Sequence, residues 1–331
     1  DNWQEQPPTG LAHRTSPTNI GLAWSPPSRL QTSAFAPRPR LRAHRAHPHD
    51  LRGAPQVARP PLHWYDTRSL RPLAPKYVST VDSGNFAACL AALRRGLEDY
   101  ARPDLAARAG ALYERWIPPA LRRRAPPLPH RLGRERTEAL RRALRPALQR
   151  GAAHGLPRRG EGRGPAPPLA AALARLVSKD GYRGMASWTG TMFEYLMPEL
   201  FLPLCRDSLL WESARFCLYV QRRDRAGGGL WGQSESAFFS LDPSLSYRYK
   251  AHGCQSLALR RGMGADMVVS PYSSFLALAV EPRAAVRNLR RLCERGFTGR
   301  FGLWEAVDFT PSRTSGRGGE SVRCVMSHHL A

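Results

Sequence analysis

Lysine is nearly missing from this 331-residue chain, because arginine supplies all but three of its 50 basic residues. The three lysines are Lys76, Lys179 and Lys250. Surfaces that bind nucleic acid normally mix the two residue types, whereas a vocabulary of arginine, alanine, proline and glycine is what GC-rich codons encode. The net charge of +24 therefore predicts no specific nucleic-acid partner. A basic protein that binds RNA or DNA through its arginines stays an alternative.

Features that would define a membrane anchor, an export signal or a cofactor are also missing. No run of about 18 apolar residues could span a membrane, and residues 1–5 (DNWQE) are too polar to begin a signal peptide. The six cysteines show no CxxC spacing, which predicts reduced and mostly buried thiols. The glycine clusters at 227–229 and 262–264 do not match a phosphate-binding loop. We therefore expect no transmembrane segment, no cofactor and no metal site.

Two windows, residues 24–62 and 115–172, differ in composition from the rest of the chain. They hold 18 of the 30 prolines, and 21 arginines against four acidic residues. Neither window shows sustained helical or alternating periodicity, so regular elements are not expected there. One interpretation is a disordered basic linker.

The segments between the windows carry helical patterns. An apolar stripe at helical spacing predicts one helix, and its members are Phe86, Leu90, Leu93 and Leu97. Ser270 and Pro271 predict the N-cap and first residue of a second helix, which runs to Ala279. A third helix is expected from Pro282 to a stop at Gly296. Its inward residues are expected to be Val286, Leu289 and Leu292. Strand signals are weak apart from 267–269.

Nine short motifs follow one another along the chain in a fixed order. They are DNWQE at 1–5, AHRTSPTNIGL at 12–22, WYDT at 64–67, YVSTVDSGN at 77–85, SWTGTMFEYLMP at 187–198, WGQSESAF at 231–238, GLWEAVDF at 302–309, FTPSR at 309–313 and MSHH at 326–329. With these motifs the chain resembles the central glycoamylase-like transglycosylase domain of cyclic β-1,2-glucan synthases. Any one motif is a weak signal, but nine in register are specific.

The resemblance implies a fold, a reaction and a setting. The implied fold is an all-α, (α/α)₆-barrel-like glycosidase domain, here incomplete and interrupted by the two irregular windows. The implied reaction converts linear β-1,2-glucan to cyclic β-1,2-glucan. In the family this domain is covalently linked to a glucan-polymerising part and a phosphorylase-like part, in a bacterial polypeptide that is cytoplasmic and associated with the inner membrane. We expect the present chain to be a fragment that stops within the family's last motif.

The resemblance also offers a second interpretation of the windows. Codons for residues 144–154, read one base later, can spell YDLLCSEARL, which the family has at this place. The windows are then out-of-frame translation. The chain divides accordingly into five segments: 1–23, family-like; 24–62, out of frame; 63–114, family-like and helical; 115–172, out of frame; 173–331, a truncated glycoamylase-like catalytic segment.

Two glutamates beside aromatic residues are the candidate catalytic pair. Glu235 lies in a Gly- and Ser-rich stretch after Trp231, and Glu305 follows Trp304. Cleaving a glycosidic bond needs one protonated carboxyl to assist the leaving oxygen and one ionised carboxylate to attack carbon or to activate the nucleophile. The residues alone do not assign these roles. Ordinary alternatives are a loop carboxylate that caps a helix for Glu235, and a solvated helix start shared with Asp308 for Glu305.

Further residues are candidates for contacts with glucan. They are Trp188, Glu194, Tyr195, Trp231, Trp304, Asp308, His328, His329, Asp66, Asp82, Asn85, His13 and Arg14. Structural alternatives are a salt bridge for Glu194, core positions for the tryptophans, and caps or Asx-turns for Asp66, Asp82 and Asn85. The two adjacent histidines resemble a metal site, but neighbours on a helix point about 100° apart, which favours contact with sugar hydroxyls.

The sequence therefore favours a β-1,2-glucan transglycosylase domain whose activity is impaired if the windows remove barrel helices. Three alternatives stay open: a non-catalytic carbohydrate-binding remnant, a β-1,2-glucan hydrolase, and the arginine-driven nucleic-acid binder.

Overall fold

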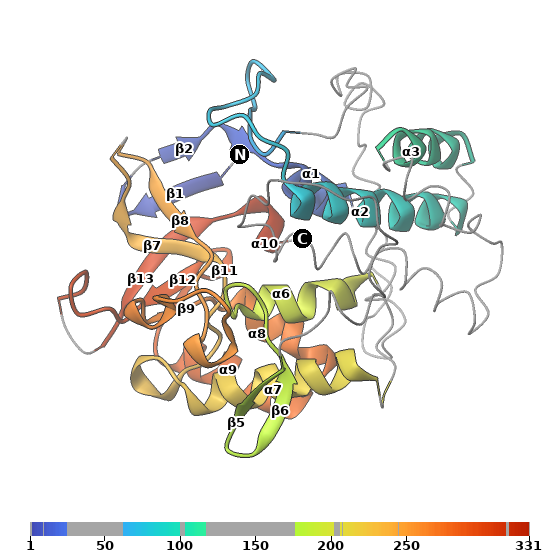
Figure 1. Cartoon of the computed structure of the whole chain (residues 1–331). Coiled ribbons are helices and arrows are strands. Elements are labelled where there is room, and N and C mark those ends of the chain that lie inside the picture. The colour runs from blue at the N-terminus through green and yellow to red at the C-terminus, as the bar shows by residue number, and fades with distance from the viewer. Residues whose placement is uncertain are drawn as a thin grey trace, which may run out of the picture. The chain divides into compact units, whose positions relative to one another are not determined.

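The computed structural model describes most of the chain outside the two arginine-rich windows (Figure 1). The described residues are 2–8, 10–24, 62–99, 103–116, 176–201, 206, 208–243, 245–315 and 318–330. Apart from a few residues at their ends, the two windows lie outside the described part. The structure therefore tests neither the linker nor the out-of-frame interpretation. Contacts between Cα atoms divide the chain into unit 1, residues 1–12 and 152–330, and unit 2, residues 13–151 with Ala331. The five-segment division stays a prediction.

Strands and helices are mixed in this structure, so the prediction of an all-α barrel is wrong. Unit 1 contains an antiparallel five-stranded sheet with the strand order β2-β1-β13-β12-β9. Its strands are β1 (Asn2–Gln6), β2 (Gly10–Ala12), β9 (Val268–Val269), β12 (Ala306–Asp308) and β13 (Glu320–Val325). Three two-stranded hairpins accompany it: β5 (Leu176–Lys179) with β6 (Tyr182–Met185), β7 (Ser236–Leu241) with β8 (Tyr247–Lys250), and β10 (Thr298–Gly299) with β11 (Gly302–Leu303).

The strands escaped prediction because their burial does not follow hydrophobicity. In β1 the polar Asn2 and Gln4 are each 1% exposed, while Trp3 between them is 36% exposed, the reverse of the usual alternation. In β12 all three residues are buried, so no alternation exists at all. Sequence patterns detect strands in which apolar buried residues alternate with polar exposed ones, and neither β1 nor β12 has that alternation.

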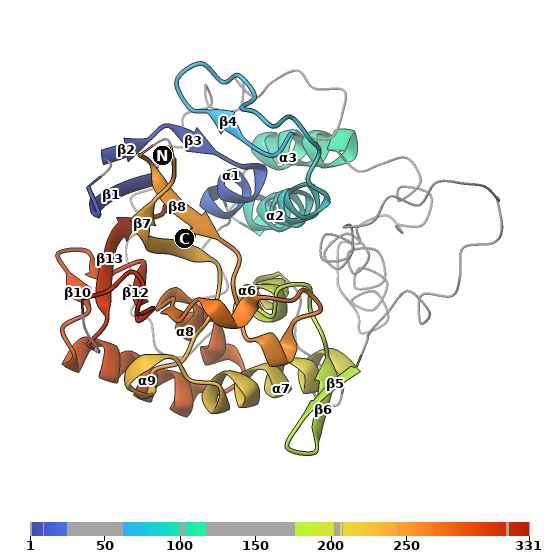
Figure 2. The same ribbon diagram turned by 60° about the vertical axis from the view of Figure 1, so that its left-hand side comes forward.

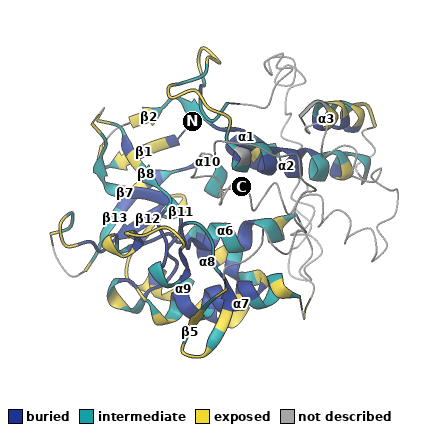
Figure 3. Cartoon of the chain, in the orientation of Figure 1, coloured by how far each residue is buried: buried dark blue, intermediate teal, exposed yellow. Residues whose placement is uncertain are grey.

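The helices of unit 1 are short and lie around the strands (Figure 2). They are α6 (Met192–Leu196), α7 (Leu209–Arg223), α8 (Tyr272–Leu276), α9 (Pro282–Glu294) and α10 (Ser327–Leu330). Single 3₁₀ turns occur at Met197–Leu200, Gly227–Gly229, Gln255–Leu257, Met263–Ala265 and Ala277–Ala279. In Figure 3 buried and exposed residues alternate along α7 and α9, as on helices that cover a core. No helix in the described ranges is long and apolar enough to cross a membrane.

The sheet forms a middle layer, because alternate residues of β9 and β12 pack into two different hydrophobic clusters. Val268 and Ala306 pack into the cluster that also holds Phe238 and Tyr247 of the β7–β8 hairpin. Their chain neighbours Val269 and Val307 pack on the other side, in the cluster that contains Leu292 of α9. A third cluster surrounds α7 and includes Phe216 and Leu218, each 0% exposed. Each such side chain contributes about 1.5–3 kcal/mol on burial, so these clusters hold the strands that carry the site.

The predicted helices of unit 1 are confirmed in place but not in every detail. The second begins at Tyr272, and Ser270 does not cap it; its hydroxyl donates to the carbonyl of Ser234 instead. The third is α9, which buries Leu292 but leaves Val286 38% exposed, contrary to prediction. Its stop at Gly296 is confirmed, since this glycine has a φ of 76°.

Among the described residues, unit 2 contains a two-stranded sheet and three helices. Strand β3 (Arg14–Thr15) pairs with β4 (Tyr65–Asp66), and the helices are α1 (Pro17–Trp24), α2 (Thr80–Asp99) and α3 (Pro103–Trp116). The stripe that predicted α2 is confirmed, with Phe86 and Leu90 only 4% and 1% exposed. Helix α1 approaches α2 closely at Gly21, where a Cβ atom would meet the side chain of Cys89 at 2.9 Å.

Candidate functional site

The two predicted glutamates lie at the starts of two neighbouring strands. Glu235 directly precedes β7, and Glu305 directly precedes β12. The backbone N–H of Ala237 donates to the Glu305 carboxyl, and the N–H of Phe239 donates to Oδ2 of Asp308 at 3.2 Å. Two side chains, one just before β12 and one at its end, are therefore held by the β7 backbone, which brings Glu235 and Glu305 into one neighbourhood.

Glu305 is paired with a histidine from the short helix α10. Nδ1 of His329 lies 2.8 Å from Oε2 and 3.0 Å from Oε1 of Glu305. The two side chains are only 5% and 2% exposed, respectively. Helix α10 follows directly on β13, the sheet neighbour of β12. The sheet therefore places the histidine over the glutamate.

Burial decides where the proton of this pair resides. It raises the pKa of Glu305 well above its ordinary value, against the smaller effect of the Ala237 N–H. Burial also lowers the pKa of His329 to about 3. Both shifts favour the uncharged forms, in which the Glu305 O–H donates to Nδ1 of a neutral His329. The distances are those of an ion pair, whereas burial favours an uncharged one.

Tyr249 of β8 connects the second glutamate to the histidines. Its hydroxyl donates to Oε2 of Glu235 at 3.1 Å. Its ring centroid lies 6.3 Å from that of His328 and 6.5 Å from that of His329. Burial and then the carboxylate of Glu235 raise the pKa of Tyr249 well above its ordinary value. The phenol therefore remains protonated and serves as a fixed donor to Glu235.

Tyr272, the first residue of α8, completes the surroundings of the pair. Its ring stacks on His329, with centroids 3.7 Å apart and planes 15° from parallel. Its hydroxyl lies 2.9 Å from Oγ of Ser234, the residue before Glu235, and that Oγ accepts from the N–H of Phe193. Burial and the charges of Glu235 and Glu305 raise its pKa well above the ordinary value. We refer to Glu235, Tyr249, Tyr272, Glu305 and His329 as the carboxylate site.

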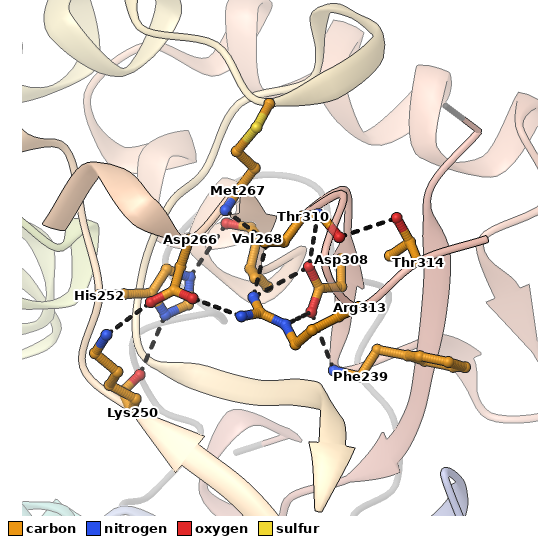
Figure 4. A network of polar contacts seen from close by, with 10 residues as sticks. All are labelled: Phe239, Lys250, His252, Asp266, Met267, Val268, Asp308, Thr310, Arg313 and Thr314. Carbon is orange, nitrogen blue, oxygen red and sulfur yellow. Dashed lines mark hydrogen bonds and ion pairs between the residues drawn. The ribbon is translucent and has the colours of Figure 1, made fainter. Parts of the chain in front are cut away.

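A network of charged side chains holds the strands behind this site (Figure 4). Arg313 bonds Asp308 through Nε at 2.7 Å and Asp266 through Nη1 at 2.7 Å, while Nζ of Lys250 lies 2.7 Å from the other oxygen of Asp266. Asp308 is 0% exposed and also accepts from the N–H of Thr310 at 2.9 Å. Its hydrogen bonds are all internal, so it supports the site structurally.

Part of the chain is similar in sequence to a known synthase. No family model matches the chain. The cyclic beta-(1,2)-glucan synthase NdvB of Rhizobium meliloti (strain 1021) is 40% identical to it over 160 residues, which are 47% of this chain and 6% of that protein. Over nearly half of its length this chain is therefore similar to a cyclic β-1,2-glucan synthase. The predicted resemblance to the cyclic β-1,2-glucan synthases is thereby confirmed, for a match that spans only a small part of the synthase's length.

Two of the predicted sugar contacts, Glu194 and Tyr195, form hydrogen bonds within their own segment of the chain. Glu194 accepts from the N–H groups of Thr189 and Thr191 and from Oγ of Ser187, and forms a capping box with Thr191. Tyr195 donates its hydroxyl to the carbonyl of Met185 at 2.6 Å. Both side chains therefore shape the loop, and for Glu194 a cap replaces the salt bridge considered from the sequence.

The three predicted tryptophans lie in different surroundings. Trp231 is 4% exposed and belongs to the core around α7. Trp304 is partly buried and covers Gly299, where a Cβ atom would lie 2.2 Å from its ring. Trp188 is partly buried, and its carbonyl accepts from the N–H of Arg260. None of the three is joined to the carboxylate site by a hydrogen bond or ring contact described in the structure.

The remaining predicted residues belong to unit 2. Asp66 accepts from the N–H groups of Arg68 and Ser69, and hydrogen bonds led by that from Ser69 lower its pKa to about 2. Asp82 receives bonds from Thr18 and His63; these bonds lower its pKa although burial acts to raise it. Both aspartates therefore act within turns and helix starts.

The other members of this set have local contacts as well. Asn85 donates to the hydroxyl of Thr18 at 3.2 Å. The carbonyl of His13 accepts from Thr67, and the guanidinium of Arg14 lies 5.4 Å from the centroid of the Trp64 ring. All three are placed by unit 2 itself.

Sequence reasoning missed Tyr249, Tyr272 and Arg313 as members of the site and its support. Arg313 stands in the FTPSR motif, and Tyr272 follows the predicted helix start, so motif and helix signals were present for both. Tyr249 lies in a four-residue strand with no distinctive pattern. In the described ranges, no group of three or more His, Cys, Asp or Glu residues could hold a metal ion.

Proposed function

We propose that the carboxylate site acts on a β-1,2-linked glucan, with Glu305 as the proton donor and Glu235 as the ionised partner. The observation that carries the proposal is the contrast between the two carboxyls. Glu305 is buried against His329, whereas Glu235 is only half-buried and accepts the hydroxyl of Tyr249. Two nearby carboxyls in opposite environments are what glycosidic cleavage requires. The glucan is inferred from the name of the synthase relative.

Glu305 supplies the proton to the leaving oxygen in this proposal. Its raised pKa favours the protonated form, which is the state that a general acid needs. When the proton leaves, the N–H of Ala237 remains to stabilise the carboxylate. His329, stacked on Tyr272, holds the carboxyl in one orientation. Its Nε2 is buried and has no partner among the described residues.

Glu235 acts on the other side of the bond in this proposal. It either attacks the anomeric carbon or removes a proton from the attacking hydroxyl, and the two routes give retention and inversion respectively. If the attacking hydroxyl belongs to the same glucan chain, the product is a ring. If it belongs to water, the product is a shorter linear glucan. The proposed reaction is the first of these, transglycosylation.

Incubation of the full chain with linear β-1,2-glucan tests the proposal. Products are separated by chromatography and identified by mass, since a ring lacks one water relative to the linear chain. Glu305→Gln and Glu235→Gln are each expected to lower turnover by about 10³-fold or more, in the range that a catalytic proton transfer contributes together with charge stabilisation. Glu320→Gln, a carboxyl at the start of β13, is the matched control and is expected to keep the activity.

Each alternative function predicts a different result in the same experiment. Linear products without rings identify a hydrolase. Glucan binding by calorimetry without turnover identifies a binding remnant. Turnover that survives both glutamine substitutions overturns the assignment of the carboxylate site.

A further inference from the structure

A second site, away from the carboxylates, lies between α7 and α9 along one edge of unit 1 (Figures 1 and 2). The C-terminal end of α7, the residues that follow it and the outer face of α9 line a pocket of about 300 Å³. Pockets that bind small molecules begin at about this volume. No residue of the carboxylate site contributes to its wall.

Arginines are five of the nine residues that line this pocket. Its five arginines are Arg222, Arg223, Arg225, Arg287 and Arg291. Two have carboxylate partners: Nη1 of Arg222 lies 2.6 Å from Glu281, and Nε of Arg223 lies 3.0 Å from Asp180. The other three form no ion pair with any described residue. The pocket therefore carries an excess of positive charge that the described part of the protein does not neutralise.

One of the uncompensated charges, that of Arg287, is placed where a helix by itself would disfavour it. Arg287 and Arg291 are four residues apart on α9, so they lie on the same face, and like charges at this spacing repel each other. Arg222, Arg223 and Arg291 have an ordinary explanation, because cations are favourable in the last turn of a helix. No such explanation covers Arg287, in the middle of α9. A bound anion between the arginines would remove the repulsion.

The floor of the pocket is rigid. Trp231 forms it and is only 4% exposed. The amide of Asn288 bonds both the carbonyl of Trp231, at 2.8 Å, and its N–H, at 3.3 Å. Nδ2 of Asn288 also donates to Oγ of Ser274 at 2.9 Å. A fixed floor with long cationic side chains around it suits a compact ligand.

The number of arginines selects the kind of anion. A carboxylate is planar and suits a single guanidinium fork, whereas a phosphoryl group presents three strong acceptor oxygens in a tetrahedral arrangement. Several guanidinium groups can approach the latter from different sides. We propose that this arginine pocket binds a small multivalent phosphate, of the class of polyphosphates and sugar phosphates. The site is independent of the proposed glycosidic chemistry.

Calorimetric titration of the full chain with inorganic pyrophosphate tests the proposal. The expected result is binding of one pyrophosphate per chain, weakened about ten-fold or more in the double variant Arg287→Ala/Arg291→Ala. The matched control is Arg283→Ala/Arg290→Ala, which removes the same charge from exposed positions of the same helix outside the pocket. The control is expected to change the affinity less than about two-fold. Circular dichroism verifies that both variants keep the fold.

Parallel titrations define the ligand class. Glucose 6-phosphate that binds where glucose does not identifies sugar phosphates as ligands, and pyrophosphate binding alone identifies polyphosphates. Equal loss of affinity in the two double variants would mean that the net positive charge of the chain attracts pyrophosphate without a specific site. This result would overturn the proposal. Citrate binding as tightly as pyrophosphate, or absence of pyrophosphate binding at low salt, would also overturn it.

Discussion

Nδ1 of His329 lies 2.8 Å from Oε2 of Glu305, and both side chains are almost fully buried. Each group alone loses its charge on burial, and together they share one proton without forming ions. The pair is thus different from a stabilising salt bridge. Its neutral carboxyl is kept in place by a sheet neighbour and a short helix, next to the half-buried Glu235.

The first prediction concerns the stability of the chain as a function of pH. Glu305 has a raised pKa in the folded state, so the folded chain binds more protons than the unfolded chain above about pH 4.5. Its favourable contribution is complete below this pH and is lost as the pH rises through the folded pKa. Glu305→Gln removes that loss. The variant should therefore be more stable than the natural chain at pH 7.5, by about 1.4 kcal/mol for each pH unit between about 4.5 and the folded pKa.

Thermal unfolding at pH 4.5, 6.0 and 7.5 measures this difference. The advantage of the glutamine variant should grow with pH and nearly vanish at pH 4.5. His329 does not produce this trend, because its lowered pKa costs stability only as the pH falls from about 6.5 toward 3. An advantage independent of pH would contradict the neutral pair.

The second prediction separates the two tyrosines of the carboxylate site. Tyr249→Phe removes the hydroxyl that donates to Glu235, a bond to a charged group that is worth about 1.5–3 kcal/mol. Turnover of β-1,2-glucan should fall by about 10- to 100-fold. Tyr272→Phe keeps the stack on His329 and removes only the bond to Ser234. Steady-state rates with the same glucan should show a clearly smaller loss for this variant, and equal losses would argue against a direct role for Tyr249.

Local signals predicted the helices, while the strands depended on contacts that only the folded chain contains. The stripe of Phe86 and Leu90 is a property of a single segment, and α2 forms where it indicates. Asn2 and Gln4 of β1 are buried because β1 pairs with β2 and β13, from the two ends of the chain. No window of sequence contains that information, so the all-α prediction failed.

In the carboxylate site, too, some residues could be predicted from the sequence and others only from the fold. Glu235, Glu305 and His329 carry chemistry that composition and motifs can indicate, and the structure brings these three together. Tyr249 reaches Glu235 across a hairpin, and Tyr272 reaches His329 from a separate helix. Their membership depends on the packing of β8 and α8 against β12 and β13. The motifs alone did not predict it.

The third prediction concerns the gene. If residues 24–62 and 115–172 are out-of-frame translation, resequencing should find compensating single-base insertions or deletions near codons 23, 62, 115 and 172. The corrected frame should replace arginine and proline by the aromatic and acidic residues of the family motifs. An intact reading frame that encodes these same residues would contradict the interpretation and favour a basic linker.

The fourth prediction concerns the charged network behind the site. Arg313→Met leaves the buried carboxylate of Asp308 without a cation and Asp266 with Lys250 alone. Removing one partner of a buried ion pair costs about 3–5 kcal/mol, so the midpoint of urea unfolding should fall sharply. Arg313→Lys keeps the positive charge but loses the bidentate guanidinium fork. Its urea midpoint should lie between those of the natural chain and Arg313→Met. Arg323→Met is the matched control, since Arg323 in β13 is 45% exposed and lies 3.8 Å from Glu5. Its cost should be within about 1 kcal/mol, and an equal cost for Arg313→Met would show that the network does not hold the strands.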